Sequence, residues 1–230
     1  MRHRIITVSN RLPVQLSKRK GVITHQVSVG GLATGLSSLH KAYDLLWLGW
    51  PGYISTDAEE QAEITAVLKD MNMMPLFLSQ DEIELYYEGF SNKTIWPLFH
   101  YFPQYVDYNP AFWLTYQQVN QRTAEAVLNI SQPGDLIWIH DYHLMLVPGL
   151  IRAQRPEAAI GYFLHIPFPS FELFRTLPWR EELMSGALGS DLIGFHTYDY
   201  ARHFTSASLR LAGVEQSMNH LVLGDRIVHV

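Results

Sequence analysis

Short apolar runs that alternate with helix-period segments are the feature that most narrows the folds open to this 230-residue chain. The runs are rich in β-branched or aromatic residues and predict strands at residues 5–8, 45–49, 136–139, 160–164 and 192–195. Strands that are apolar along their whole length are typical of parallel sheets. The sequence therefore predicts an α/β fold, a Rossmann-like parallel sheet with helices on both faces, as one domain over residues 1–230.

Apolar residues recur at steps of three or four between these runs, which is the spacing of a helix with one buried face. The longest helix is predicted over residues 109–130, with a proline in its first turn and Pro-Gly after its end. Asp57 is predicted to cap another helix, with Glu60 as its capping-box partner. The other helices are predicted over residues 32–43, 144–155, 181–188 and 200–211, and hairpins over residues 14–29 and 221–228.

The composition excludes several classes of protein. Hydrophobic residues make up 47% of the chain and charged residues 17%, a balance typical of a folded domain with an apolar core. Because there is no cysteine, disulfides, thiolate metal sites and thiol catalysis are excluded. The net charge of −5 does not indicate nucleic-acid binding, and the apolar runs are too short or too interrupted for a signal peptide or a membrane span. We therefore expect a cytoplasmic protein with neither nucleic-acid nor membrane partners.

The charge is unevenly distributed along the chain. Seven basic residues precede Asp44, which is the first acidic residue. A segment with cations and no carboxylate can favour an anionic ligand. We interpret the triplet Lys18-Arg19-Lys20 within it as a solvated basic turn.

Ligands of a parallel α/β sheet bind beyond the carboxyl ends of its strands, so the residues after each strand are the candidates for function. Arg11 follows the first strand, and its planar guanidinium suits a phosphate. Gly30 and Gly31 precede a predicted helix whose free N–H groups would attract an anion. This pair lacks the spacing of a dinucleotide-binding motif or a P-loop, so two glycines that ease a turn are an equally good interpretation.

The segment His140-Asp141-Tyr142-His143 follows a predicted strand, and three interpretations compete for it. A metal site is disfavoured because the histidines lack companion ligands at a suitable spacing. A Ser-His-Asp hydrolase is disfavoured because the chain has no Gly-x-Ser-x-Gly motif. The third interpretation makes Asp141 an acceptor for the hydroxyls of a polyol. Packed, hydrogen-bonded histidines with no further role are the alternative to all three.

His165 opens a loop that two prolines stiffen, and such a loop presents the imidazole rigidly, as binding requires. A proline-shaped connection with a satisfied histidine is the structural alternative. Aromatic residues gather around Tyr87 and Trp96, with Trp50 upstream. Aromatic rings can pack on the C–H surfaces of a sugar, although most rings of this chain are expected in the core.

The segments at the strand ends form a series of motifs. They are Ser-Asn-Arg at 9–11, Gly-Gly-Leu at 30–32, Trp-Leu-Gly-Trp-Pro-Gly at 47–52, Tyr-Tyr-Glu-Gly-Phe-Ser-Asn at 86–92, Ile-Trp-Pro at 95–97, Trp-Ile-His-Asp-Tyr-His-Leu at 138–144, Leu-His-Ile-Pro-Phe-Pro at 164–169 and Leu-Ile-Gly-Phe-His-Thr at 192–197. In this order, and over nearly the whole chain, they resemble the trehalose-6-phosphate synthase family.

The resemblance implies the N-terminal half of a double-Rossmann (GT-B type) glycosyltransferase that is retaining, metal-independent and free of cofactors. It implies UDP-glucose as the donor and glucose 6-phosphate as the acceptor. Asp141 and His165 would then be the catalytic residues. The resemblance also implies binding roles: Arg11, Tyr87 and Trp96 at the acceptor phosphate, Trp50 and Asp141 at the acceptor glucose, Gly30 and Gly31 near the donor phosphates, and His165 at the donor glucose.

Because the chain stops at Val230 inside an apolar run, we expect the C-terminal donor-binding domain to be absent from it and these 230 residues to be inactive alone. Two rival functions are a glucosylglycerol-phosphate synthase-like transferase and a non-catalytic sugar-phosphate-binding domain. The donor nucleotide and the oligomeric state stay open, and a homo-oligomer is compatible with the sequence.

Overall fold

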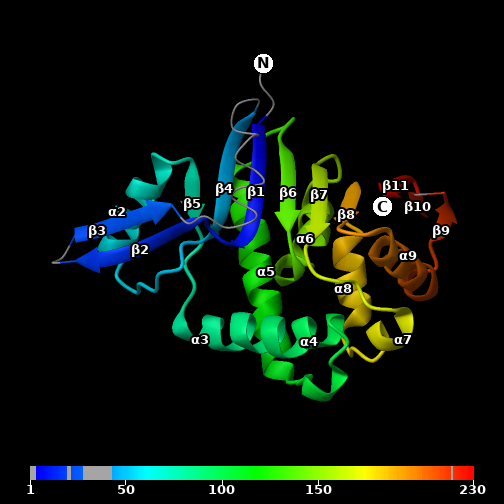
Figure 1. Ribbon diagram of the computed structural model, residues 1–230. Helices are drawn as coiled ribbons and strands as arrows, with labels where there is room; N and C mark the ends of the chain where they lie inside the picture. Colours follow the sequence, from blue (N-terminus) through cyan, green and yellow to red (C-terminus); the bar gives the residue numbers. More distant parts are fainter. Residues whose placement is uncertain (1–3, 20–21, 28–42, 219) are drawn as a thin grey trace.

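A nine-stranded sheet runs through the protein in the computed structural model, which describes residues 4–19, 22–27, 43–218 and 220–230 (Figure 1). Its strand order is β5-β4-β1-β6-β7-β8-β11-β10-β9. The strands are β1 (Arg4–Arg11), β4 (Asp44–Trp50), β5 (Met73–Pro75), β6 (Leu136–His140), β7 (Ala159–Leu164), β8 (Leu192–Phe195), β9 (Glu215–Ser217), β10 (His220–Leu223) and β11 (Arg226–His229).

The first six strands of this order are parallel to their neighbours. When these six strands are numbered by their sequence along the chain, their order across the sheet is third, second, first, fourth, fifth and sixth. This is the order of a doubly wound Rossmann sheet. The order therefore reverses between β1 and β6, and a ligand crevice is expected at their carboxyl ends. The predicted parallel sheet is confirmed, although the short strand β5 was not predicted.

Helices lie on both faces of the sheet, as predicted. Trp47 and Leu48 are neighbours on β4, but they belong to different hydrophobic clusters because successive strand residues point to opposite faces. One face packs against α5 (Pro110–Ile130), α6 (Val147–Gln154), α8 (Arg180–Ala187) and α9 (Tyr198–Ala212). The other packs against α2 (Ala58–Lys69) and a hairpin of β2 (Val14–Arg19) and β3 (Val22–Val27). The helix predicted over residues 32–43 lies almost wholly outside the described residues.

Short helical segments connect these elements along the carboxyl edge of the sheet (Figure 1). They are α3 (Gln80–Glu82), the π-helix η2 (Ile83–Ile95), α4 (Trp96–Phe99), η3 (Pro103–Tyr105), η4 (Tyr142–Leu144) and α7 (Phe171–Phe174). Among the described residues, no helix has the length and apolar character needed to cross a membrane.

The cap of α2 is only partly as predicted. The Asp57 carboxylate accepts from the N–H of Glu59, so Asp57 is the N-cap. The predicted capping box is wrong, because Glu60 accepts instead from Lys18 Nζ at 2.6 Å and from Tyr53 Oη at 3.2 Å. Lys18 is therefore paired with α2 and is not part of a merely solvated turn. The hairpin brings a cation within reach of Glu60, and an ion pair outcompetes the local bond to the cap.

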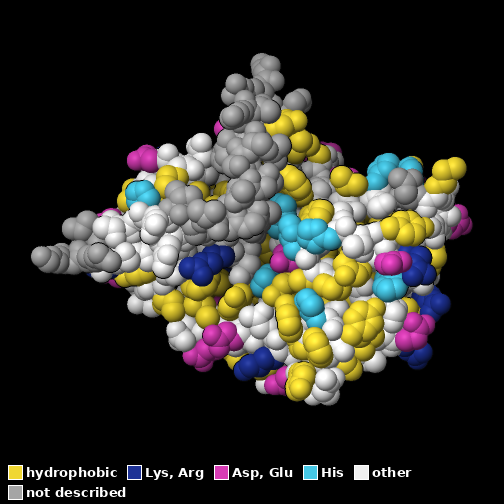
Figure 2. Space-filling view, in the orientation of Figure 1, with side chains coloured by type: hydrophobic (Ala, Val, Ile, Leu, Met, Phe, Trp, Pro, Cys, Tyr) yellow, Lys and Arg dark blue, Asp and Glu magenta, His cyan; other side chains and the backbone are white. Residues whose placement is uncertain are grey.

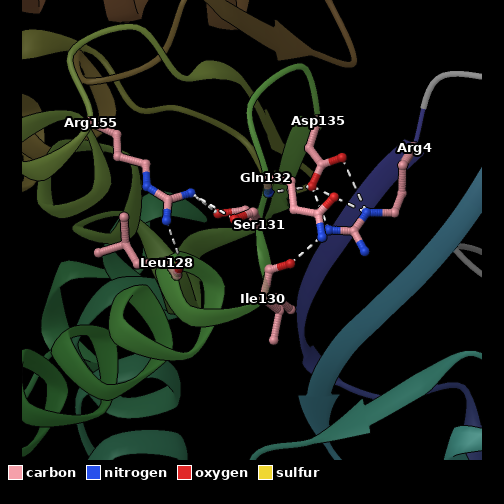
Figure 3. A network of polar contacts seen from close by, with 7 residues as sticks. All are labelled: Arg4, Leu128, Ile130, Ser131, Gln132, Asp135 and Arg155. Atoms are coloured by element: carbon pink, nitrogen blue, oxygen red, sulfur yellow. Dashed lines mark hydrogen bonds and ion pairs between the residues drawn. The ribbon is translucent and has the colours of Figure 1, made fainter.

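A network of arginines holds the connection from α5 to β6 (Figure 3). Arg4 Nη2 donates to Asp135 Oδ2 at 2.6 Å and to the carbonyl of Ile130 at 2.7 Å. Arg155 donates to the carbonyl oxygens of Leu128 and Ser131. Cations stabilise the negative end of a helix dipole and satisfy its free carbonyl groups. The network thus fixes where β6 begins, and with it the position of the residues at the end of β6.

Glycines allow α6 and the end of α8 to approach closely. A Cβ atom at Gly189 would lie 2.4 Å from the backbone nitrogen of Gly149, a distance that real Cβ atoms do not show. Gly189→Ala is therefore expected to lower the free energy of unfolding by about 3 kcal/mol, measured by urea denaturation. Gly161→Ala is the matched control, because its Cβ would meet Trp138 at an ordinary 3.5 Å. Equal losses in the two variants would contradict the explanation by close packing.

Candidate functional site

The carboxyl ends of β1, β6 and β7 border one cleft of about 590 Å³. Histidine side chains gather at the centre of the face shown in Figure 2, with an acidic side chain beside them. The cleft is lined by Ser9, Asn10, Arg11, Trp50, Ile83, Tyr87, Glu88, His140, Asp141, Tyr142, His143 and His165. The structure thus brings together five of the residues predicted for the site: Arg11, Trp50, Tyr87, Asp141 and His165.

Arg11 presents a cation to this cleft. Ser9 accepts from Trp47 Nε1 at 2.7 Å and donates to the carbonyl of Arg11 at 2.9 Å, which holds the irregular end of β1. The guanidinium lies over the ring of Trp50, 5.6 Å from its centroid. Gly52 has φ +73°, and a Cβ there would lie 2.6 Å from the guanidinium. Among the described residues no carboxylate pairs with Arg11, so its charge is available to an anionic ligand.

Asp141 stands directly after β6 in a strained backbone conformation, with φ 74° and ψ 169°. Residues other than glycine rarely adopt this region, and such strain is found at functional sites. Oδ1 accepts from the N–H groups of Tyr142 at 3.0 Å and His165 at 3.2 Å. Burial raises the pKa of Asp141 to about 6, although these two hydrogen bonds act in the opposite direction. The carboxylate is ionised at neutral pH and can accept bonds from hydroxyl groups.

His165 is the first residue after β7, and its ring belongs to a row of three histidines. Its Nε2 lies 3.1 Å from Nδ1 of His140, and its ring centroid lies 5.5 Å from that of His196. Burial lowers the pKa of His165 to about 4, and the charge of His196 adds to this effect. The imidazole is therefore neutral at pH 7. The main-chain bond to Asp141 and the ring bond to His140 together hold it at the edge of the cleft.

The π-helix η2 forms one wall of the cleft. Residues five apart share a face in a π-helix, because each turn holds more residues than in an α-helix. Ile83 and Glu88, five residues apart, therefore lie on one face and line the cleft, with Tyr87 beside Glu88. Asn92, further along η2, does not line the cleft and accepts from Tyr142 Oη at 3.0 Å. The π-helix thus allows one short segment both to line the cleft and to hold the loop after β6.

His143 is a packed histidine, as one interpretation of the sequence required, but it is not hydrogen-bonded. Its ring stacks on Tyr87 at a centroid distance of 5.7 Å and lies 3.9 Å from that of Tyr142. Among the described residues, neither ring nitrogen has a partner. Burial lowers the pKa of His143 to about 3, so it stays neutral and supports Tyr87. The described residues hold no cluster of three or more His, Cys, Asp or Glu side chains that could bind a metal.

One predicted residue, Trp96, is not brought into the cleft. The Trp96 side chain stacks on His100 at 4.1 Å, is 41% exposed and does not belong to the residues that line the cleft. Gly30 and Gly31 lie outside the described residues. Sequence reasoning also missed Glu88 and Asn10. Their place within motifs next to Tyr87 and Arg11 was the only available signal.

The strand order and the cleft at its switch point define an α/β domain of the Rossmann type with a candidate ligand site at that cleft. Residues 3–230 match the model of glycosyltransferase family 20, and the chain belongs to this family.

Two relatives agree with the assignment to glycosyltransferase family 20. The chain is 45% identical over 229 residues to alpha,alpha-trehalose-phosphate synthase (UDP-forming) A of Dictyostelium discoideum, a match covering 99% of the chain and 31% of the relative. It is 44% identical to the 56 kDa subunit of the Saccharomyces cerevisiae enzyme of that name, with coverages of 98% and 47%. The chain therefore spans 31% and 47% of the lengths of these two relatives.

Solved structures show the same fold. An alpha,alpha-trehalose-phosphate synthase from Burkholderia vietnamiensis matches with a TM-score of 0.81 and 30% identity, covering 100% of this chain and 48% of its own. The N-terminal domain of a trehalose-6-phosphate phosphatase from Candida albicans matches with a TM-score of 0.83 and 31% identity, with coverages of 100% and 48%. The predicted fold, the N-terminal half of a double-Rossmann (GT-B type) glycosyltransferase, is thus confirmed.

Proposed function

We propose that residues 1–230 form the acceptor-binding domain of a retaining glycosyltransferase. It transfers glucose from UDP-glucose to glucose 6-phosphate and yields trehalose 6-phosphate and UDP. Relatives named as UDP-forming synthases support this activity, and an Escherichia coli neighbour described as bound to UDP-2-fluoro glucose supports the donor. The chain spans about half of the structural neighbours, which supports a second, donor-binding domain beyond these residues.

One observation carries the proposal: Arg11 and Asp141 lie in the same cleft, at the carboxyl ends of the two strands that flank the switch point. A sugar phosphate combines a dianion with a ring of hydroxyl groups, and the cleft offers a cation for the first and a carboxylate for the second. Tyr87 and Trp50 supply aromatic surface for the sugar between them. Trp96 is exposed and outside the cleft lining, so its contact with the acceptor phosphate stays a prediction from the family resemblance.

In the proposed reaction an acceptor hydroxyl forms a bond to the anomeric carbon of the donor glucose while the bond from that carbon to the UDP oxygen breaks. The departing phosphate oxygen takes the proton of the hydroxyl. Asp141 would orient the acceptor hydroxyls, and His165 would hold the donor glucose by a hydrogen bond. Gly30 and Gly31 would lie near the donor phosphates. Positioning of both sugars at attack distance is the main contribution of this domain.

The proposal is tested by UDP release with the protein expressed from its complete coding sequence. UDP-glucose is supplied with glucose 6-phosphate, glucose or glycerol 3-phosphate. We expect turnover with glucose 6-phosphate and little with the other two. Preference for glycerol 3-phosphate would replace the proposal with a glucosylglycerol-phosphate synthase-like transferase.

A second candidate is a sugar-phosphate-binding domain without transferase activity. The match to the N-terminal domain of a phosphatase favours it, because that protein is named for a different reaction. Calorimetric binding of glucose 6-phosphate with no UDP release under any donor would establish this candidate.

Residues 1–230 alone are expected to transfer no glucose at a measurable rate and to keep weak glucose 6-phosphate binding. A retaining transfer needs cationic groups at the departing diphosphate, because charge develops there in the transition state. Among the described residues, the cleft lining contains one cation, Arg11, which is assigned to the acceptor. Comparing UDP release by this polypeptide and by the complete protein tests the expectation. Turnover by residues 1–230 would show that the proposed division between two domains is wrong.

A further inference from the structure

Two histidines from different strands share a hydrogen bond at the edge of the cleft. His140 is the last residue of β6 and is 1% exposed, while His165 follows β7. Nδ1 of His140 lies 3.1 Å from Nε2 of His165. His140 is one residue before Asp141, and the proposed reaction assigns it no direct contact with a substrate.

The bond between the two rings holds a single proton. Two N–H groups, or two lone pairs, facing each other at this distance would repel. Burial lowers the pKa of His140 to about 3 and that of His165 to about 4, so both rings are neutral at pH 7. One ring donates and the other accepts, which leaves two possible tautomer pairs.

The surroundings of His140 select one of these pairs. Its Nε2 is buried and has no partner among the described residues. If Nε2 carried the proton, a buried N–H would be left without an acceptor, and orphaned buried N–H groups are rarer than under-satisfied acceptors. The proton of His140 therefore belongs on Nδ1, and Nε2 of His165 accepts it. His165 must then carry its own proton on Nδ1, for which no described residue provides a bond.

We propose that His140 is a positioning residue that sets the tautomer of His165, so that His165 presents an Nδ1–H donor to a hydroxyl of the donor glucose. The ring of His165 is also packed against Phe163 at a centroid distance of 4.6 Å, and Asp141 holds its main-chain N–H. The ring bond to His140, the packing against Phe163 and the main-chain bond to Asp141 together fix the position of His165. The identity of the hydroxyl partner rests on the proposed function, whereas the tautomer does not.

Nitrogen-15 NMR of the histidine side chains in the complete protein tests the tautomer, with the His165 signals assigned by their loss in His165→Gln. We expect the neutral Nδ1–H form of His165 between pH 6 and 8. His140→Leu should allow protonation at Nε2 of His165 and raise the KM for UDP-glucose about fivefold, the worth of one hydrogen bond. The KM for glucose 6-phosphate should change less than about twofold. His140→Asn, whose amide can donate from nearly the same place, should restore both readouts.

His220→Leu is the matched control, since His220 faces His229 at 4.4 Å in the β10–β11 hairpin and is absent from the cleft lining. It should leave the His165 signals and the KM for UDP-glucose unchanged. An Nε2–H or cationic His165 in the unaltered protein, or a tautomer unaffected by His140→Leu, would overturn the proposal. If the tautomer behaves as expected but no protein releases UDP, the proposed function fails and the positioning role stands.

Discussion

Asp141→Asn is expected to raise the free energy of unfolding by about 2–3 kcal/mol at pH 8 while lowering glucose transfer about 100-fold. The folded protein raises the pKa of this carboxyl to about 6, from an ordinary value of about 4, and each unit is worth about 1.4 kcal/mol. Asparagine avoids burying the charge. Because both residues would adopt the same strained φ of 74°, the comparison leaves the backbone strain nearly constant.

The sign of the pH dependence follows from the direction of the shift. A raised pKa means that the folded state favours the protonated carboxyl. The protonated carboxyl of Asp141 makes its full favourable contribution to the free energy of unfolding below pH 4. This contribution is lost as the pH rises through 6. The advantage of Asp141→Asn should therefore vanish near pH 4 and reach its full size above pH 7. Urea denaturation across this range measures it.

Activity should move in the opposite direction, because the amide replaces a charged acceptor. A hydrogen bond to a charged group contributes about 1.5–3 kcal/mol, so loss of one or two in the transition state accounts for about two powers of ten.

Asp135→Asn is the matched control for stability. Burial raises the pKa of Asp135, but the bonds from Arg4 and from the N–H of Gln132 outweigh it and hold that pKa below its usual range. Asp135→Asn should therefore destabilise the fold above pH 4, and the loss should fade as the pH falls through the lowered folded pKa. If both substitutions lowered the free energy of unfolding, the buried charge of Asp141 would not be destabilising the folded protein.

The sheet could be predicted because its determinants are local. Strands such as β6 and β8 are short apolar runs between helix-period segments. Their order in the sheet was not predicted, because it depends on which distant segments pair in the folded protein. β5 was missed because three residues, Met73–Pro75, carry too little pattern. The predicted capping box at Glu60 was wrong because the pattern there is local but the partner is distant. The actual partner of Glu60, Lys18, is 42 residues away in the chain.

Less of the site could be predicted from pattern alone. Arg11, Asp141 and His165 were candidates because each follows a strand, and the parallel sheet brings such residues to one edge. Their charge states and orientation depend on contacts between distant segments, such as the ring bond from His140 to His165. The π-helix leaves no signal in a search for periods of two or 3.6, so the face shared by Ile83 and Glu88 was not foreseen.

Arg11→Ala is expected to weaken binding of glucose 6-phosphate by about one to two powers of ten and to leave binding of glucose nearly unchanged. The guanidinium has no ion pair among the described residues, so the phosphate would be its main partner. A charge-assisted hydrogen bond contributes about 1.5–3 kcal/mol, which sets the size of the loss. Calorimetric titration of the complete protein with both sugars measures the difference.

Two further variants separate charge from geometry. Arg11→Lys keeps the positive charge but loses the planar fork, so its affinity for glucose 6-phosphate should fall between those of alanine and arginine. Arg202→Ala removes an exposed cation on α9 whose partner is Asp199, and it should leave both affinities unchanged. Equal losses for glucose and its phosphate in Arg11→Ala would assign Arg11 to the structure of the cleft, through its contact with Trp50. A loss confined to the phosphate, smaller with lysine, is the result that only a phosphate-binding arginine explains.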